Sequence, residues 1–212
     1  EEICRGITLA SGLNASPSPN QGWVRVMCES ETMAGWLLRA IAMENVSIRM
    51  EGPSIDLPAG PAFRLDKEIK NVVTVLAKTA HYWVDHMWRV QRLEIGHLFA
   101  VLAEGSPLVE PALSAGTAVD DETDSSAVAQ EILRRTGLTA STGKYTGWAG
   151  VACPNVRAAV WMMRMLIADN ILSRREDTVL YVPVNPATDP NGKTVAASLS
   201  RIQELAKTQG VL

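Results

Sequence analysis

The chain contains one 41-residue pattern twice without a gap, and this repeat decides the fold. The first copy (22–62) reads GWVRVMCESETMAGWLLRAIAMENVSIRMEGPSIDLPAGPA, and the second (147–187) reads GWAGVACPNVRAAVWMMRMLIADNILSRREDTVLYVPVNPA. Thirteen positions are identical at a constant offset of 125 residues, and most others exchange similar side chains. The sequence therefore predicts two copies of one structural unit, in which Trp36 and Trp161 have equivalent surroundings.

Each copy predicts the same order of elements. Alternating β-branched residues predict a strand over 23–27. Ser30 is the expected N-cap of a helix over about 31–44, and Asn155 takes that role in the second copy. Two short strands, near 46–50 and 54–57, form a predicted β-hairpin, repeated near 171–175 and 178–182.

The segments outside the repeats are expected to be helical. We expect Glu1–Arg5 to be the last turn of a helix that ends at Gly6, as a helix over about 126–136 ends at Gly137, because glycine tolerates positive φ. After the first copy, one very long helix is predicted over about 66–103. After the second copy, a shorter helix is predicted over about 193–208.

These elements predict an α/β or α+β fold built from two tandem strand-helix-β-hairpin-helix repeats with one long helix. Residues 1–104 form the first repeat, 105–125 a linker and 126–212 the second repeat. The apolar helix of one repeat cannot be buried by that repeat alone, so we expect the two to fuse into one pseudo-twofold domain, which is the intramolecular form of an isologous contact.

Composition excludes some partners. The 212 residues carry a formal net charge of −3, which gives no electrostatic reason to expect nucleic acid. No apolar run is long enough to predict a membrane-spanning helix, and so no membrane partner is expected. Three cysteines, an odd number without a CxxC motif, favour a reducing, cytoplasmic setting over a disulfide scaffold.

Cys28 and Cys153 are candidate reactive thiols, because each lies between a strand and the N-terminus of a helix. Free cysteine is also among the most buried residue types, and no histidine is near in sequence. Simple packing is therefore the alternative for both residues.

Four repeated arginines are candidate ligand-binding residues. Arg39 and Arg164 are single charges inside apolar helices, and a buried charge must be paired. One hypothesis pairs them with Glu51 and Glu176 within each repeat. The other makes them converge with Arg49 and Arg174 on an anion, since the planar guanidinium fork fits carboxylate or phosphate.

The loop 137–144 offers a weaker anion site through Thr139 and Lys144. Its spacing misses the phosphate-loop pattern, and a helix precedes it where a strand is required. A loose site of backbone amides or a plain capping loop are the two alternatives.

All three histidines lie in the segment that only the first repeat has. His81 and Asp85 are one helical turn apart, so they share a face, and His86 follows closely. These three are the candidate catalytic residues, and no set of metal ligands is assigned. The alternative is a helix face that packs through its aromatic residues or forms an oligomer interface.

The sequence thus favours a cytoplasmic, metabolic protein that binds, and possibly transforms, a small anionic molecule between the repeats. Arginines would hold the charge, and His81, Asp85 and His86 would supply acid–base chemistry. The first alternative is a non-catalytic assembly protein whose long aromatic helix forms a homo-oligomer or partner interface. A metal-dependent enzyme is the third. The sequence names no cofactor.

Overall fold

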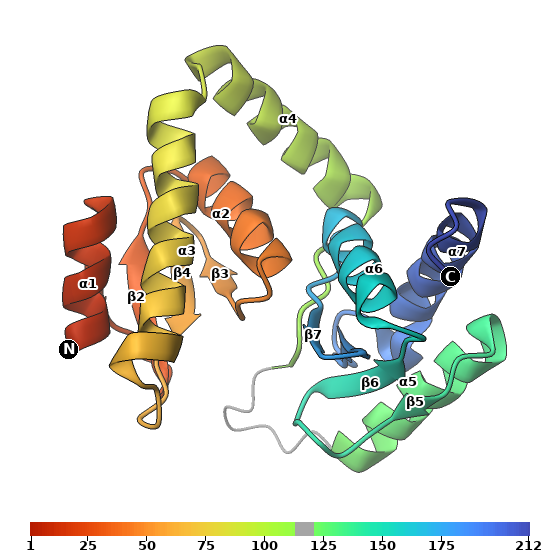
Figure 1. The fold of residues 1–212 in the computed structure, drawn as a ribbon. Coiled ribbons are helices and arrows are strands. Elements are labelled where there is room, and N and C mark those ends of the chain that lie inside the picture. The colour runs from red at the N-terminus through yellow and green to blue at the C-terminus, as the bar shows by residue number, and fades with distance from the viewer. Residues whose placement is uncertain (113–120) are drawn as a thin grey trace. The chain divides into compact units, whose positions relative to one another are not determined.

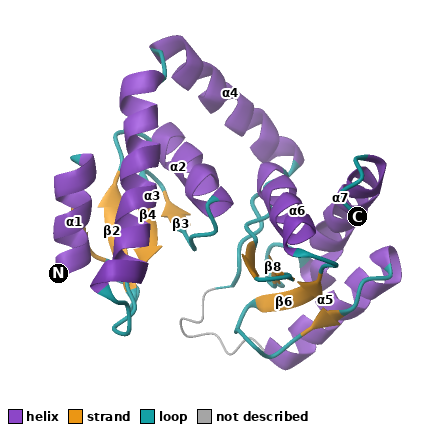
Figure 2. Cartoon of the chain, viewed as in Figure 1, coloured by secondary structure: helices purple, strands orange, loops and turns teal. Residues whose placement is uncertain are grey.

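The computed structural model describes residues 1–112 and 121–212, without the side chains of residues 121–123. It divides the chain into two compact units, Glu1–Leu102 and Ala103–Leu212. Each unit combines helices with a four-stranded antiparallel sheet, so the α+β fold with two repeats is confirmed (Figures 1 and 2). The prediction that the repeats fuse into one pseudo-twofold domain stays a prediction.

Unit 1 begins with a helix and a strand pair, continues through a helix and a hairpin, and ends in further helical segments. In chain order these are α1 (Glu2–Ser11), β1 (Ala15–Pro17), β2 (Trp23–Met27), α2 (Glu31–Met43), β3 (Arg49–Glu51), β4 (Ser54–Pro58), η1 (Leu65–Ile69), α3 (Lys70–His81), η2 (Tyr82–His86) and α4 (Arg89–Gly105), whose last residues belong to unit 2.

Unit 2 repeats this order and ends after its last helix. Its elements are α5 (Asp121–Thr136), β5 (Ala140–Ser141), β6 (Trp148–Ala152), α6 (Val156–Ala168), β7 (Arg174–Glu176), β8 (Val179–Pro183), the short 3-10 turn η3 (Pro190–Gly192) and α7 (Lys193–Thr208). The helix predicted over 193–208 is confirmed. None of the helices in the described ranges is long and apolar enough to span a membrane.

The two sheets share both strand order and register. The order is β1-β2-β4-β3 in unit 1 and β5-β6-β8-β7 in unit 2. Trp23 lies opposite Pro58 in the first sheet, and Trp148 lies opposite Pro183 in the second, at the same offset of 125 residues as in the sequence. Because a one-residue slip would move every side chain to the other face, equal registers mean that equivalent side chains share a face.

Each sheet buries one face under its helices. In unit 1 the inward positions Val24, Val26, Ile55 and Leu57 are at most 4% exposed. In Figure 1 the helices α1, α2 and α3 lie on one side of this sheet. The opposite face, called here the outer face, carries the alternate residues of the same strands, which are mostly polar or aromatic in both units.

The helix boundaries follow the capping residues that the sequence predicts. Ser30 Oγ accepts a hydrogen bond from the Met33 amide at 3.1 Å. Asn155 Oδ1 accepts one from the Ala158 amide at 2.9 Å. After each helix, Asn45 and Asn170 both adopt φ of 62°, a left-handed conformation that asparagine tolerates better than most residues.

The first helix is longer than predicted. Gly6 lies inside α1, and the residue that ends this helix in the left-handed conformation is Gly12, with φ of 73°. Gly12 is the true counterpart of Gly137, whose φ is 70°. The repeat therefore extends upstream of 22–62 at the same offset, and comparing Gly6 with Gly137 was wrong by six residues.

The prediction of one unbroken helix over 66–103 is also wrong. The chain leaves helical geometry at Met87, whose φ and ψ are −99° and 125°, and Figure 1 shows a sharp turn between α3 and α4. The segment before this break, η2, is a π-helical turn. Periodicity did not reveal the break because helical residues flank it on both sides.

The linker predicted over 105–125 is shorter than expected. Val109 forms a parallel β-bridge with Ile171, and α5 begins at Asp121. Residues 113–120 of the predicted linker lie outside the described residues.

Trp36 and Trp161 occupy equivalent helix positions but have different neighbours. Trp36 stacks on Tyr82 with ring centroids 6.0 Å apart and contacts Trp83 at 5.6 Å. Both partners belong to η2, which has no counterpart among the described residues of unit 2. The equivalence predicted for these tryptophans thus holds for the backbone and fails for the aromatic contacts.

Candidate functional sites

The three predicted catalytic residues lie together at the end of α3. His81 Nδ1 lies 2.6 Å from Asp85 Oδ2, and His81 Nε2 lies 3.3 Å from His86 Nε2. Tyr82 stacks on the His86 ring with centroids 5.7 Å apart. The side chains of His81 and Asp85 are more than half exposed, so solvent reaches the cluster. The arrangement can orient an imidazole through a carboxylate, but its catalytic role stays a prediction.

A second cluster lies on the outer face of both sheets and combines a tryptophan, an arginine and a glutamate. The three side chains are Trp23, Arg49 and Glu51 in unit 1 and Trp148, Arg174 and Glu176 in unit 2. The Arg49 guanidinium lies 5.2 Å from the Trp23 ring centre, and that of Arg174 lies 5.6 Å from the Trp148 ring centre. We call this shared arrangement the Trp-Arg-Glu motif.

In unit 1 an internal ion pair fills the centre of the outer face. Asp56 is 4% exposed and accepts hydrogen bonds from Arg25 Nε at 2.8 Å and Ser18 Oγ at 2.8 Å. Burial alone would raise the pKa of Asp56, but the hydrogen bonds from Arg25, Ser18 and Asn20 outweigh burial and lower it. Arg25 also donates to Glu51 at 2.6 Å. Charge on this face is therefore balanced within the protein.

In unit 2 the positions equivalent to this ion pair carry no charge. Tyr181 replaces Asp56 and Gly150 replaces Arg25 at the constant offset. The Arg174 guanidinium lies 4.4 Å from the Tyr145 ring centre and 5.3 Å from that of Tyr181. The outer face of unit 2 thus holds the Tyr181 ring beside Arg174, at the position where unit 1 holds the carboxylate of Asp56.

Two cations in unit 2 converge on one carboxylate. Lys144 Nζ and Arg174 each lie 2.6 Å from Glu176, whose other hydrogen bond comes from the Tyr145 hydroxyl at 2.7 Å. Hydrogen bonding to Glu176 raises the pKa of Lys144 above its usual value. Burial opposes ionisation of Glu176, but Lys144 and Tyr145 bind its charged form, and its pKa is lowered. The side chains therefore carry two positive charges against one negative charge.

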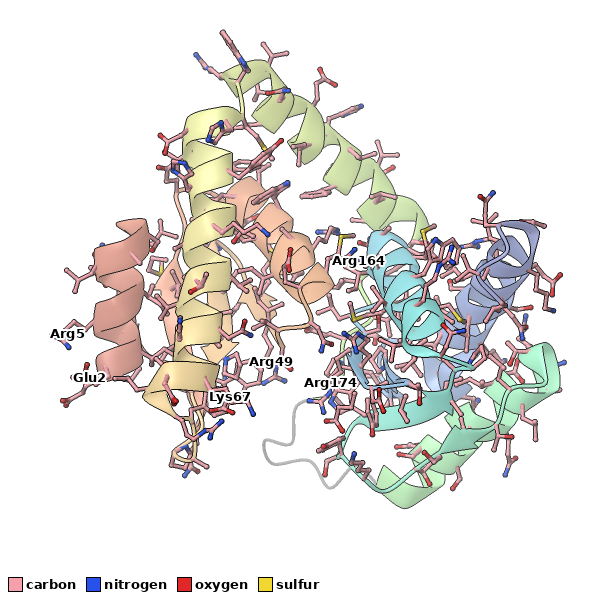
Figure 3. All side chains as sticks on the ribbon, viewed as in Figure 1. Glu2, Arg5, Arg49, Lys67, Arg164 and Arg174 are labelled. Atoms are coloured by element: carbon pink, nitrogen blue, oxygen red, sulfur yellow. The ribbon has the colours of Figure 1, made fainter. Side chains whose placement is uncertain are left out.

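The helix arginines do not form the predicted bridges to these glutamates. Glu51 and Glu176 lie on the outer face, whereas the helices pack on the other side of the sheet. Arg39 donates to the Gly35 carbonyl at 2.8 Å and lies 4.1 Å from the centre of the Phe99 ring of α4. Arg164 is the counterpart of Arg39 on α6, and it is exposed. Figure 3 labels Arg164 as well as Arg49 and Arg174.

The remaining predicted ligand residue, Thr139, is exposed just before β5. Its backbone carbonyl accepts a hydrogen bond from the Ala152 amide at 3.5 Å. The structure thus brings Lys144 together with Arg174, and leaves Thr139 outside that cluster.

The two candidate thiols are buried. Desolvation raises the pKa of Cys28 to about 12, with a smaller contribution from Glu29, and raises that of Cys153 to about 11. An activated thiol needs a lowered pKa, so burial acts against the reactivity predicted from the helix N-termini.

A groove of about 560 Å³ lies beside the start of α1, where Cys4, Trp23 and Phe63 contribute to its walls. None of the predicted site residues lines it, and it carries no part of the function proposed below.

Comparison with known proteins identifies no relative. No protein-family model, no curated protein and no solved structure matches the chain.

Proposed function

We propose that the protein binds a small anionic molecule on the outer face of the unit 2 sheet, as a metabolic protein of the cytoplasm. Its three cysteines are all free, which supports a reducing compartment. The proposal rests on unit 2 alone, in which Lys144, Arg174 and the surrounding aromatic rings provide the charge and the contact surface.

The observation that carries this proposal is the convergence of two cations on the single carboxylate of Glu176. One side chain cannot use the full donor capacity of an ammonium and a guanidinium, so an anion can bind beside Glu176. Tyr145 and Tyr181 hold the guanidinium by cation–π contacts and reduce the rotamer freedom it loses on binding. Unit 1 serves as an internal comparison, because Asp56 occupies there the position that Tyr181 has in unit 2.

Isothermal titration with inorganic phosphate, citrate and benzoate tests the proposal. At least one of these probes should bind, and Lys144→Ala should weaken its affinity by about 10-fold or more, because a hydrogen bond to a charged group contributes about 1.5–3 kcal/mol. Arg174→Lys should also weaken binding, since lysine keeps the charge but loses the planar stack.

Lys207→Ala is the matched control, because Lys207 also lies 2.6 Å from a glutamate, Glu204, but on α7 and without aromatic neighbours among the described contacts. This control should leave the affinity unchanged. The proposal is wrong if none of the three probes binds, or if the Lys207 control weakens binding as much as Lys144→Ala.

A second candidate function, self-assembly through α4, is favoured by the exposed side of that helix. Val90, Leu93 and Val101 are 68%, 63% and 52% exposed. The opposite side of α4 packs on α2, where Gly96 meets Thr32. Leu98 is also exposed. At about 100° of rotation per residue, these four positions lie within an arc of about 140° and so form one largely apolar stripe.

The stripe is self-complementary, which favours a second copy of the chain as its partner. Two antiparallel α4 helices would place Val90 against Val101, and Leu93 against Leu98. The same pairing would place Glu94 against His97, so that apolar and charged positions match in an isologous contact.

Sedimentation velocity tests this second candidate. The wild-type chain should be a dimer, and Leu93→Asp should be a monomer, because the stripe would then bury an unpaired charge. The control Leu9→Asp, at an exposed leucine of α1, should remain a dimer. A monomeric wild-type chain at tens of micromolar, or a dimer that Leu93→Asp leaves intact, would exclude assembly through α4.

A further inference from the structure

The histidine pair at the end of α3 presents two ring nitrogens to each other. His81 Nδ1 lies 2.6 Å from Asp85 Oδ2, a contact that requires a proton between them. A neutral imidazole carries one proton, so the Nε2 atom of His81 has a free lone pair. This lone pair faces His86 Nε2 at 3.3 Å.

The separation of 3.3 Å between the two Nε2 atoms fits a shared metal ion better than a direct hydrogen bond. Hydrogen bonds from protein N–H groups are usually about 2.7–3.2 Å long. Two imidazole nitrogens bound to tetrahedral zinc at about 2.0–2.1 Å lie about 3.3–3.4 Å apart. The pair therefore has the spacing of two ligands of one metal ion.

The local backbone makes this pairing possible. In a regular α-helix, residues five apart point about 140° away from each other. The π-helical turn η2, Tyr82–His86, widens the helix so that hydrogen bonds span five residues. His81 and His86 then share one face. Such wide turns often occur at functional sites.

We propose that His81 and His86 form a binding site for a divalent transition-metal ion of the zinc, nickel or copper class. Imidazole nitrogen suits these metals, whereas magnesium and calcium prefer oxygen ligands. Asp85 is a positioning residue: its carboxylate holds the proton on His81 Nδ1 and so keeps Nε2 available, the common outer-shell arrangement of zinc-bound histidine.

The site is open to further ligands. Among the described residues, no group of three or more histidine, cysteine or acidic side chains is placed to hold a metal, so water would fill the remaining positions. A metal site with vacant or water-filled positions can polarise a bound molecule, as catalytic rather than structural zinc sites do. This inference uses unit 1 only and is independent of the anion site proposed for unit 2.

The test is isothermal titration of the untagged chain with Zn²⁺ alone. One ion should bind per chain, and His86→Ala should reduce the affinity by at least 10-fold. Asp85→Asn should reduce it by about 10- to 100-fold, the usual effect of losing such a positioning carboxylate. His97→Ala is the matched control, because it removes the remaining exposed histidine from α4 and should leave the affinity unchanged.

A second readout separates metal binding from a change in folding. In ¹⁵N spectra of the imidazole rings, Zn²⁺ should shift the Nε2 signals of His81 and His86 while the Nδ1 signal of His81 stays that of a protonated nitrogen. The proposal is overturned if Zn²⁺ leaves both Nε2 signals unchanged, which would identify a simple hydrogen bond between the rings. It is equally overturned if His97→Ala weakens binding as much as His86→Ala.

Discussion

Removing the carboxylate of Asp56 should strongly destabilise unit 1. Asp56 accepts hydrogen bonds from Ser18 at 2.8 Å, Asn20 at 3.2 Å, and Arg25 at 2.8 and 3.1 Å. In Asp56→Ala the Arg25 guanidinium, whose side chain is only 21% exposed, keeps Glu51 as its remaining carboxylate partner. The variant therefore leaves a mostly buried charge with much weaker compensation.

The expected loss of unfolding free energy is about 3 kcal/mol. Breaking a buried ion pair from one side usually costs about 3–5 kcal/mol. The lower end applies here, because Glu51 still binds Arg25, and Ser18 and Asn20 lie near enough to the surface to be hydrated. Glu51→Ala is the matched control: its side chain is 75% exposed, so removing it should cost less than about 1 kcal/mol.

Urea unfolding followed by tryptophan fluorescence measures this difference. Replacing Trp148 and Trp161 with phenylalanine in every variant restricts the signal to unit 1, which holds the other four of the six tryptophans. The transition midpoint should fall in Asp56→Ala with little change in slope. A loss below 1 kcal/mol, or one no larger than that of Glu51→Ala, would refute the idea that this pair organises the outer face.

The same pair predicts a pH dependence. Because the folded-state pKa of Asp56 is lowered, its contribution is fully present above the unfolded pKa of about 3.9. The contribution is lost as pH falls through the lowered pKa of the folded state. The stability difference between wild type and Asp56→Ala should therefore be constant from pH 7 to about pH 5 and shrink only in stronger acid.

Two further predictions concern the repeated positions. Ser30→Ala and Asn155→Ala should each lower the unfolding free energy by about 1 kcal/mol, because each removes the side-chain acceptor for a helix N-terminal amide. Urea unfolding measures both losses. A loss in only one of the two units would contradict the equivalence of the two caps. Iodoacetamide at neutral pH should leave Cys28 and Cys153 unmodified until the chain is unfolded, because burial raises the pKa of both thiols. Rapid native alkylation of either residue, detected by peptide mass spectrometry, would restore the reactive-thiol hypothesis.

The core of each repeat could be predicted from the sequence because the same pattern occurs twice. An ambiguous strand or cap in one copy, such as Ser30, is supported by its counterpart, Asn155. The end of α1 was predicted less well, because glycine near a helix invites assignment as its end. Gly6 is nonetheless helical, and only the constant offset of 125 residues would have selected Gly12 instead.

The sites were predicted in part. The spacing of His81 and Asp85 is one α-helical turn, and their contact followed from it. The contact between His81 and His86 was missed, because α-helical periodicity places residues five apart on different faces and no sequence signal announced a π-helical turn.

The partners of Glu51 and Glu176 were also missed. The prediction matched charges by repeat position and ignored which face of the sheet each residue occupies. The alternation of side chains along a strand could have corrected this prediction. Trp23 and Arg25 lie on the same face of β2, and Asp56 lies on that face too, because it pairs with Arg25.

The central claim is that one structural unit occurs twice with the same strand register. An experimental structure of the full chain tests it most directly, through the pairing of β2 with β4 and of β6 with β8. The account predicts Trp23 opposite Pro58 and Trp148 opposite Pro183, with positive φ at both Asn45 and Asn170. A one-residue shift in either sheet, or a negative φ at one of the two asparagines, would contradict it.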